Sequence, residues 1–478
     1  MAEAPVAHEA PAPKMSVAVL AAMVVGSMVG AGVFNLPGRF ATATGVLGGL
    51  TAWIIAGAGM LMLALVFQSL AIRKPDLDAG VFAYAKAGFG EYLGFFSAFG
   101  YWASACVGNA FYWILISSTL GGTLTIFGHG DTLAALVLSS IAVWVYFLLV
   151  RRGVKDAALI NRIVTIAKMV PILMFIVLCL FAFKPAVFAD NLTAAAYGSL
   201  FDQVKATMLV TVFVFLGIEG ASTYSRHAEK REDVGRATVL GFLSVLAIFA
   251  SVTIVSYGVL PYQQIAALRQ PSTAGVLEAA FGSWGGAFVS IGLIVSVLGA
   301  YLAWTLMSSE VLYMAAKTGD MPRFLARVSP AGVPTAALVM TTVVIQVILV
   351  GVMFVSNALD FALDLTAALS LIPYLFVAAY AVKLAWTRET YAPNAGIRRD
   401  LIVAGLATVY TIFLVYAAGL KFLLLSFIVY APATILFVMA RREQGKKLFS
   451  GRELVILAVS VVGAIAGIVA LATGAVSL

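Results

Sequence analysis

The sequence predicts an all-α protein that crosses a lipid bilayer about thirteen times, with a five-plus-five inverted repeat in which helices 1 and 6 are broken. Three observations predict this class: high hydropathy, positive charge confined to alternate loops, and glycine breaks in two apolar segments. Hydrophobic residues make up 62% of the 478 positions and charged residues 11%, with a mean hydropathy of +1.03. Because soluble domains carry charge at about a quarter of their positions, lipid must cover most of this chain.

Each crossing needs about twenty apolar residues to cover roughly 30 Å of hydrocarbon. Two of the predicted spans, 400–420 and 422–440, depend on a turn marked by Lys421 and Ser426. A single helix over both segments would be too long for one crossing. The tail over 1–15 is predicted to be disordered, and the first run is too long for a signal peptide. The predicted spans are 16–41, 45–71, 90–120, 132–150, 158–183, 203–225, 237–260, 284–315, 334–356, 360–384, 400–420, 422–440 and 454–475.

Positive charge orients these spans. Lys168 lies inside a span, and nearly all the other Lys and Arg residues fall in one set of alternate loops. Such residues accumulate on the cytoplasmic side, which places the N-terminus in the cytoplasm and, after thirteen crossings, the C-terminus outside the cell (inner) membrane. The net charge of +8 follows from these loops and does not indicate nucleic acid. The opposite set of loops holds only Arg39, Lys184, Lys205, Arg269 and Lys421.

Neither a metal site nor an enzyme active site is indicated. Cys106 and Cys179 lie in apolar runs, and His8, His129 and His227 have no ligand partner at metal-binding spacing. No H-E-x-x-H or G-x-S-x-G motif is present. We therefore expect no cofactor, no metal and no catalysis.

Two spans contain glycine breaks at matching places. The first carries Gly26, Gly30 and Gly32, and the sixth carries Gly217 and Gly220 around Glu219. Close packing of small residues is the alternative for the first span alone. Because each half would hold five helices, an odd number, the halves have opposite membrane orientations, and paired breaks in inverted halves indicate a transporter site. Freed N–H groups suit a substrate carboxylate, and freed carbonyls suit an amino group.

Ionisable groups within spans need a reason, because charge at membrane depth costs a few kcal/mol. We expect Glu219 to face the cavity as a gating carboxylate, with an internal hydrogen-bonding strut as the alternative. Lys168 is expected to replace a coupling cation and hold the first and eighth spans together, unless it reaches the cytoplasmic interface. Glu310 is either a second substrate or relay carboxylate or a partner of Lys168 or a loop arginine. Asp360 and Asp364 are expected to be interfacial caps or funnel charges, and Asp364→Asn is expected to have only a mild effect.

With these residues in place, the chain resembles the amino acid–polyamine–organocation superfamily, and within it the basic amino acid/polyamine antiporters of arginine/ornithine type. The resemblance covers essentially the whole chain beyond the tail. It is carried by residues 30–37 (GAGVFNLP), 73–75 (RKP), 79–80 (AG), 84–90 (YAKAGFG), 217–219 (GIE), 303–306 (AWTL), 315–317 (AAK) and 320–322 (DMP). It implies the LeuT-like fold, with repeats over 16–183 and 203–384 and three further spans over 400–478.

The resemblance also implies a binding site. Substrate α-carboxylate and amino groups would contact Met28, Gly30, Ala31 and Gly32, although relatives often carry serine where Ala31 stands, so only backbone contact transfers. Lys168 matches the lysine that replaces sodium, and Glu219 matches the gating glutamate. Glu310 stays a coupling candidate from the residues alone. The remaining implied or candidate substrate contacts are Tyr101, Asn109, Phe213, Gly217, Glu219, Trp304 and Thr366, with Ser370 as the alternative to Thr366 and Tyr374 as a further aromatic candidate.

The implied activity is exchange of arginine or lysine for ornithine or a related amine by alternating access. A proton-coupled cationic amino acid symporter and a non-transporting membrane sensor are the alternatives. The expected partners are cationic amino acids or amines and the lipid bilayer, with a homodimer left open. Preference among arginine, lysine, ornithine, histidine and a diamine also stays open, because one glutamate and one tryptophan accommodate each of them.

Overall fold

The computed structural model describes residues 16–77, 80–153, 157–219, 231–392 and 396–477, and within these ranges its regular secondary structure is all helical. Helices suit a chain in lipid because every backbone N–H finds a carbonyl within its own segment. The main helices are α1 (Val17–Met28), α2 (Leu36–Ala41), α3 (Val46–Arg73), α4 (Val81–Phe89), α5 (Glu91–Gly121), α6 (Leu133–Arg151), α7 (Ala157–Phe181), α8 (Pro185–Asp190), α9 (Leu200–Phe215), α11 (Arg231–Ser256), α12 (Tyr262–Ala267), α13 (Ser272–Phe281), α14 (Ser283–Lys317), α15 (Thr335–Gly351), α16 (Ala358–Thr387), α17 (Arg398–Glu443) and α18 (Gly451–Ala472).

Nine helices in the described ranges are long and apolar enough to cross a membrane, or eleven if two bent pairs each count as one span. Two features explain the difference from thirteen. The predicted sixth span corresponds to α9, of 16 residues, and its continuation falls in 220–230, outside the described ranges. Helix α17 has 46 residues, about 69 Å at 1.5 Å per residue, which is more than twice the hydrocarbon thickness. Thirteen crossings therefore stay a prediction.

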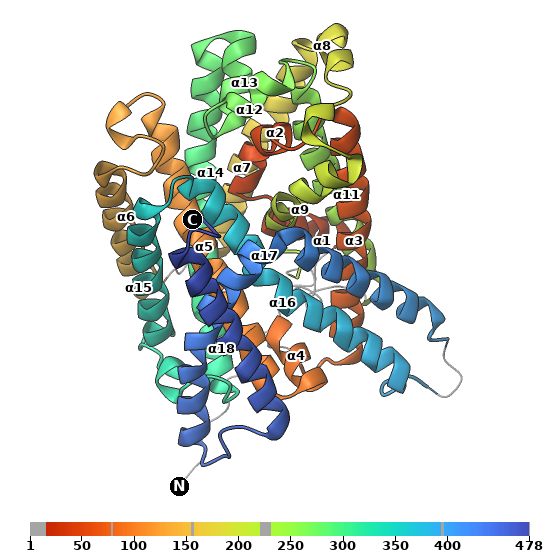
Figure 1. Ribbon diagram of the computed structural model, residues 1–478, viewed down its shortest axis with the longest axis vertical. Coiled ribbons are helices and arrows are strands. Elements are labelled where there is room, and N and C mark those ends of the chain that lie inside the picture. Colours follow the sequence, from red (N-terminus) through yellow and green to blue (C-terminus); the bar gives the residue numbers. More distant parts are fainter. Residues whose placement is uncertain (1–15, 78–79, 154–156, 220–230, 393–395, 478) are drawn as a thin grey trace.

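A kink at Gly419 divides α17, because this residue has φ 75° and ψ 172° inside an otherwise helical run. Glycine adopts positive φ without the penalty that a Cβ imposes. The kink lies two residues before Lys421, where the sequence predicts a turn between two spans. The first half of α17 packs against α16 and α3, and the second half lies beside α18 (Figure 1).

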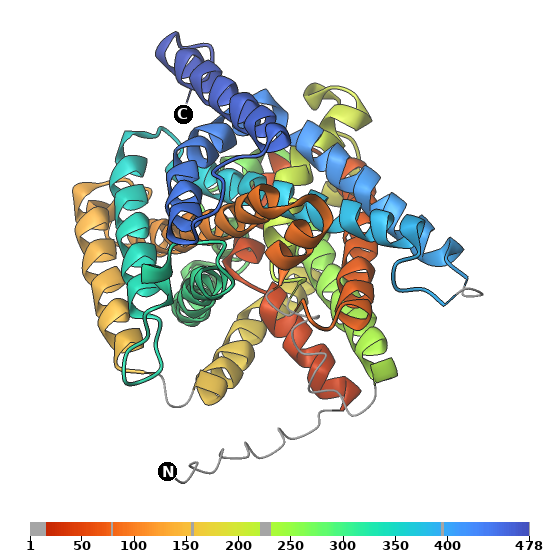
Figure 2. The same ribbon diagram turned by 90° about the horizontal axis from the view of Figure 1, so that it is seen from below.

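The helices form a bundle with α5 at its centre and apolar surfaces outside. Within α5, 89% of the most hydropathic window is buried, against 17% for α18. Figure 2 shows α5 enclosed by other helices and α18 at the edge. Large apolar side chains on the peripheral helices are exposed, among them Val347 on α15, Ile412 on α17 and Val462 on α18. This surface suits contact with lipid chains.

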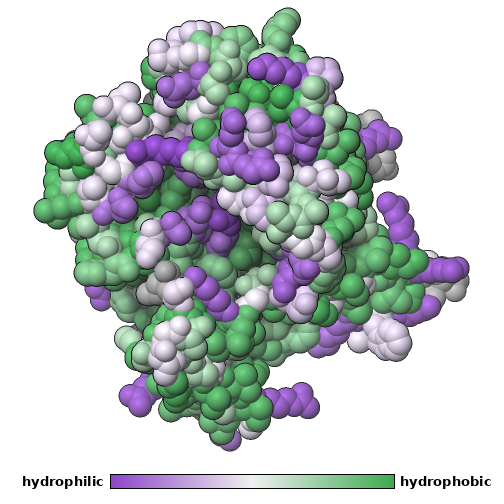
Figure 3. All heavy atoms as spheres, turned by 45° about the horizontal axis from the view of Figure 1, so that its top comes forward, coloured by the Kyte–Doolittle hydropathy of each residue, from purple (hydrophilic) through white to green (hydrophobic). Residues whose placement is uncertain are grey.

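The two ends of the bundle differ. Helices α2, α8, α12 and α13 lie at one end, which we call the α12–α13 end, and α4 lies toward the other (Figure 1). Figure 3 shows hydrophilic residues gathered across the α12–α13 end and hydrophobic residues over the flanks. At the α4 end, the Lys86 ammonium lies 2.8 Å from the carboxylate of Asp320. Burial raises the pKa of Asp320, and Lys86 opposes that rise.

Candidate functional site

The breaks in the first and sixth spans meet in the middle of the bundle. Helix α1 ends at Met28, and extended backbone at Val29 and Gly30 leads into the 3-10 helix Ala31–Asn35, with a bend of 53° across the break. Helix α9 ends at Phe215 and gives way to turns through Glu219. Backbone groups at such helix ends lack intrahelical partners and are free to bind a ligand.

Gly217 makes the contact between the two breaks. It has φ +101°, a conformation that favours glycine. The hydroxyl of Ser27 donates to the carbonyl oxygens of Gly217 at 3.1 Å and Val24 at 2.8 Å. A Cβ on Gly217 would collide with the carbonyl of Ser27. The glycine is thus required both by backbone conformation and by the close approach of α1.

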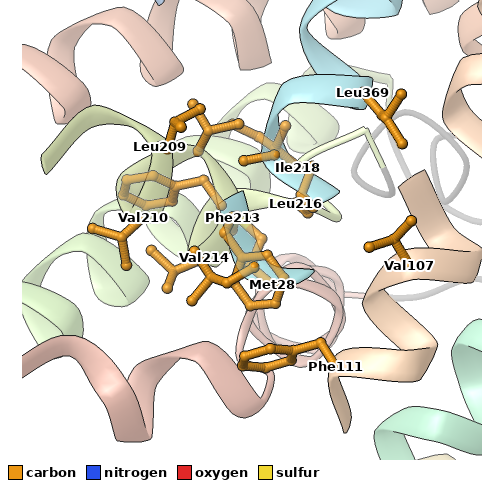
Figure 4. Packing of buried hydrophobic residues seen from close by; sticks show 14 of the residues in the cluster. Met28, Val107, Phe111, Leu209, Val210, Phe213, Val214, Leu216, Ile218 and Leu369 are labelled. Carbon is orange, nitrogen blue, oxygen red and sulfur yellow. The ribbon is translucent and has the colours of Figure 1, made fainter. Parts of the chain in front are cut away.

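The apolar candidates at the first break are packed rather than open. Met28, Ala31 and Phe213 are buried, and a Cβ built on Gly32 would lie 2.7 Å from the ring of Phe213. The ring of Phe213 also packs edge-on against Phe111, with centroids 4.8 Å apart. Figure 4 shows Met28, Phe111 and Phe213 gathered beside the break. Side-chain contact with a polar ligand at Ala31 and Gly32 is excluded, which leaves their backbone groups.

Glu219 is held by two tyrosines from different helices. Tyr101 on α5 donates its hydroxyl to Oε1 of Glu219, and Tyr374 on α16 donates to Oε2 at 2.6 Å. The Glu219 residue is 8% exposed. From sequence, the two tyrosines are candidates to contact a cationic substrate through their ring faces. In the structure, their hydroxyl groups instead donate to the carboxylate of Glu219. Glu219 therefore joins the sixth-span break to α5 and α16 at once.

Lys168 lies inside the protein and contacts the first break. It is 4% exposed, and its ammonium donates to the carbonyl of Gly26 near the end of α1. Among the described hydrogen bonds it has the expected contact with the first span and none with α14. Glu310 on α14 is exposed, and no ion pair joins it to Lys168 within the described ranges. Of Lys168 and Glu310, only Lys168 has a described hydrogen bond to a break.

The candidates on α5 and α16 lie on helices that contact each other, and Trp304 lies on α14. Asn109 is fully buried, and neither its amide nitrogen nor its oxygen has a hydrogen-bond partner in the described structure. Thr366 faces α5, where Ser104 donates to its carbonyl at 2.7 Å, and its own hydroxyl donates to Ala362. Trp304 is partly buried. An unpaired buried amide costs free energy unless something bonds to it, so Asn109 stays a strong candidate for substrate contact.

Asn35 is a polar residue that the sequence analysis did not single out. It lies in the 3-10 helix after the first break, is fully buried, and has no partner for either amide atom in the described part of the chain. An asparagine inside an apolar run was the only signal that could have found it.

The α12–α13 end of this site is closed. Arg39 on α2 pairs with Asp364 at 2.5 Å and with Asp360 at 3.3 Å, both on α16. The segment leading into α13 covers α2, where the amide of Gly38 donates to the hydroxyl of Ser272 at 2.9 Å. From sequence, the two aspartates are expected to be caps or funnel charges at the membrane interface. Their ion pairs with Arg39 on α2 are visible only in the structure. Toward the α4 end, Gly26, Ser27 and Trp304 are partly exposed and Glu310 is exposed.

No metal centre accompanies this site in the described ranges, since no three His, Cys, Asp or Glu residues cluster there. Helical spans with paired breaks around a buried carboxylate define a membrane transporter that binds its substrate at mid-depth. A family model for amino acid permeases matches residues 16–438, so the chain belongs to the amino acid permease family of the amino acid–polyamine–organocation superfamily. It is a multi-pass membrane transporter of the amino acid permease type and not an enzyme.

Three relatives are similar over almost their whole length. The chain is 47% identical over 476 residues to an arginine/ornithine antiporter of Pseudomonas aeruginosa, covering 97% of this chain and 98% of the relative. It is 40% identical over 484 residues to an L-lysine transport protein of Corynebacterium glutamicum, covering 97% and 96%. It is 36% identical over 447 residues to an arginine/agmatine antiporter of Chlamydia abortus, covering 91% and 92%.

Proposed function

We propose that this protein exchanges external arginine or lysine for internal ornithine or a related amine. The observation that carries the proposal is the Glu219 carboxylate, held beside the junction of the two breaks by Tyr101 and Tyr374. A buried carboxylate beside free backbone groups suits a substrate with a cationic side chain and a zwitterionic backbone. The similarity to relatives named for arginine, ornithine and lysine supports the same substrate class.

The substrate backbone would bind at the first break. Extended backbone at Val29 and Gly30 interrupts the helix, so N–H groups at the start of the following 3-10 helix are available to an α-carboxylate. The α-amino group would bond carbonyls of the opposing break around Gly217. The cationic side chain would then extend toward Trp304, whose ring face favours cations. Asn109 would bond whichever polar group lies nearest to its unpaired amide.

Coupling would depend on Glu219 and Lys168. A substrate that reaches Glu219 competes with the hydroxyls of Tyr101 on α5 and Tyr374 on α16 for its carboxylate. Substrate binding would therefore weaken the hydrogen bonds that link α5 and α16 to the sixth-span break. Lys168 places its ammonium at the first break through its bond to Gly26. An ammonium at this place takes the position of a coupling cation, which favours sodium-independent exchange.

The closed α12–α13 end is assigned to the outside of the cell. Positive residues favour the cytoplasmic side, and they concentrate in the loops of the α4 end, including Arg323, Arg398 and Lys447. With this orientation in the inner membrane, the N-terminus is cytoplasmic, and the structure corresponds to a conformation closed to the outside. Opening would require Arg39 to leave Asp360 and Asp364.

Reconstituted vesicles test the exchange. Labelled arginine uptake is measured into vesicles loaded with ornithine, with lysine, or with buffer, in the presence and absence of a proton gradient. We expect rapid uptake only with an internal cationic substrate. Equal uptake into empty vesicles that requires a proton gradient would replace the exchanger with a proton symporter. Competition by unlabelled arginine, lysine, ornithine, histidine and a diamine then ranks the substrates.

A variant pair tests the role of Glu219. Glu219→Gln leaves one acceptor for two tyrosine hydroxyls and removes the charge, a loss of about 1.5–3 kcal/mol for a charge-assisted hydrogen bond, or roughly 10- to 100-fold in exchange rate. Glu278→Gln is the matched control, because Glu278 on α13 is exposed. Equal exchange rates for both variants at equal protein amounts would remove Glu219 from the mechanism.

A further inference from the structure

A long apolar groove lies between four helices of the bundle. It encloses about 670 Å³ between α5, α15, α16 and the second half of α17. Every described residue that lines it is apolar, and representative ones are Phe99, Trp102, Ile348, Leu365, Pro432 and Leu436. Ile435, also in the lining, is 66% exposed, so the groove is open toward the membrane. A lining without polar groups cannot bind the amino acid substrate.

The groove has the length of one lipid leaflet. Met340 and Gly351 both line it along α15, and eleven residue steps of 1.5 Å give about 16 Å, against roughly 15 Å for half the hydrocarbon thickness. The indole N–H of Trp102 donates to the hydroxyl of Thr341 at 3.0 Å, which ties α5 to α15 along the groove. The result is a narrow apolar channel that runs parallel to a membrane-spanning helix, the shape of an extended acyl chain.

A positive charge lies beside one end of the groove. Phe361 lines the groove, and its ring centroid lies 6.3 Å from that of Phe422 on α17. The ammonium of Lys421 lies 5.5 Å from the Phe422 ring. Lys421 forms no ion pair with any residue in the described ranges. A cation without a direct ion pair, near lipid headgroups, complements a phosphate.

We propose that this groove binds one acyl chain of a membrane phospholipid, with the headgroup phosphate at Lys421. The lipid would rest on the helices that hold the substrate site. Trp102 and Ala103 in the groove directly follow Tyr101, and Leu365 lies between Asp364 and Thr366. A bound acyl chain therefore packs against α5 and α16 from the lipid-facing side. It supports these helices in the positions where their side chains contact Glu219 and Arg39.

Filling the groove tests the proposal. A Cβ built on Gly351 meets no described heavy atom within 4 Å, so Gly351→Phe can place its ring in the groove without displacing the backbone. Gly405 on the first half of α17 has the same open surroundings and lies outside the groove, which makes Gly405→Phe the matched control. Lys421→Gln removes the phosphate contact and leaves the groove unfilled.

The readout is native mass spectrometry of the full-length protein released from detergent after purification from phosphatidylglycerol–phosphatidylethanolamine membranes. We expect one phospholipid to remain on the wild type and on Gly405→Phe, at least tenfold less on Gly351→Phe, and a several-fold reduction on Lys421→Gln. Equal lipid on wild type and Gly351→Phe, or none on the wild type, would overturn the proposal. So would a Gly351→Phe variant that loses a dimer instead of a lipid, because a second copy would then occupy the groove. None of these outcomes depends on transport.

Discussion

The ion pair between Arg39 and Asp364 offers the sharpest test of how the site is closed. Arg39→Gln removes the cation that joins α2 to two carboxylates on α16. In a conformation open at this end, α2 and α16 would separate and the charges would be hydrated. The pair therefore stabilises the closed conformation, and its loss should raise the fraction of molecules that are open to the outside.

The solvent exposure of the Arg39–Asp364 ion pair sets the free-energy change expected for Arg39→Gln. The side chains of Arg39 and Asp364 are 16% and 15% exposed, so the pair lies between a surface pair and a buried one. Exposed pairs contribute about 0–1 kcal/mol, and removal of one partner from a buried pair costs about 3–5 kcal/mol. We take about 2 kcal/mol, which corresponds to a roughly 30-fold shift in the ratio of open to closed molecules. Asp360, at 3.3 Å and 41% exposed, should contribute less.

Cysteine accessibility in whole cells measures that shift. Tyr112 on α5 is 6% exposed, and its hydroxyl lies 3.5 Å from a Cβ built on Gly30, so Tyr112→Cys reports access to the first break. The two native cysteines, both buried, are first replaced by alanine. An impermeant thiol reagent added outside should react about 30-fold faster in Arg39→Gln, and Asp364→Asn should add little to it, because the two residues act as one pair.

Lys205→Gln is the control for this experiment, since Lys205 on α9 lies over the ring of Tyr416, away from the Arg39 ion pairs. An unchanged reaction rate in a well-expressed Arg39→Gln variant would refute the reasoning. It would also support the sequence-based expectation that Asp364→Asn has only a mild effect.

Three further predictions concern the breaks and the α4 end. Lys168→Met removes the charge-assisted bond to α1, about 1.5–3 kcal/mol, and should slow exchange at least tenfold in vesicles. Gly217→Ala imposes about 1–2 kcal/mol of backbone strain and a collision with α1, and should slow exchange by a similar factor while the protein is still made. Lys86→Met leaves Asp320 buried without its cation and should lower the melting temperature in detergent more at pH 8 than at pH 5. The sign follows from the pKa of Asp320, which burial raises and Lys86 lowers: without Lys86 the carboxyl is protonated more readily, and the protonated form needs no partner as pH falls.

Each of these has a control. Lys205→Met removes a positive charge without touching a break, and Gly405→Ala changes a glycine with open surroundings and ordinary helical backbone. Full exchange in Lys168→Met, or equal effects of Gly217→Ala and Gly405→Ala, would contradict the roles assigned to the breaks. A Lys86→Met melting difference that is the same at both pH values would show that Asp320 does not titrate in this range.

Local sequence patterns were enough to locate the long apolar helices and the two breaks. Hydropathy locates helices in lipid because each helix satisfies its own backbone, so no distant partner is needed. Gly30 and Gly217 were found for a related reason, since a helix interruption inside an apolar run is visible in the run itself. The bond from Lys168 to α1 also follows the expected direction, because a buried ammonium in this span had few carbonyls within reach.

The partners of the charged residues could not be predicted in this way. Arg39 and Asp364 are 325 positions apart, and the hydroxyls on Glu219 come from residues 118 and 155 positions away. Such contacts depend on how the helices pack, and helix packing follows side-chain shape rather than hydropathy. The unpaired amide of Asn35 and the apolar groove could not be predicted from the sequence for the same reason.

The sequence by itself determined that this protein lies in a membrane, that two of its helices break, and that a carboxylate stands at one break, because lipid forces each of these features onto a single segment. Only the tertiary structure decided that the breaks touch through Ser27 and Gly217, that two tyrosines hold Glu219, and that Arg39 closes one end. These are contacts between segments, and their geometry exists only once α1, α5, α9 and α16 are packed together.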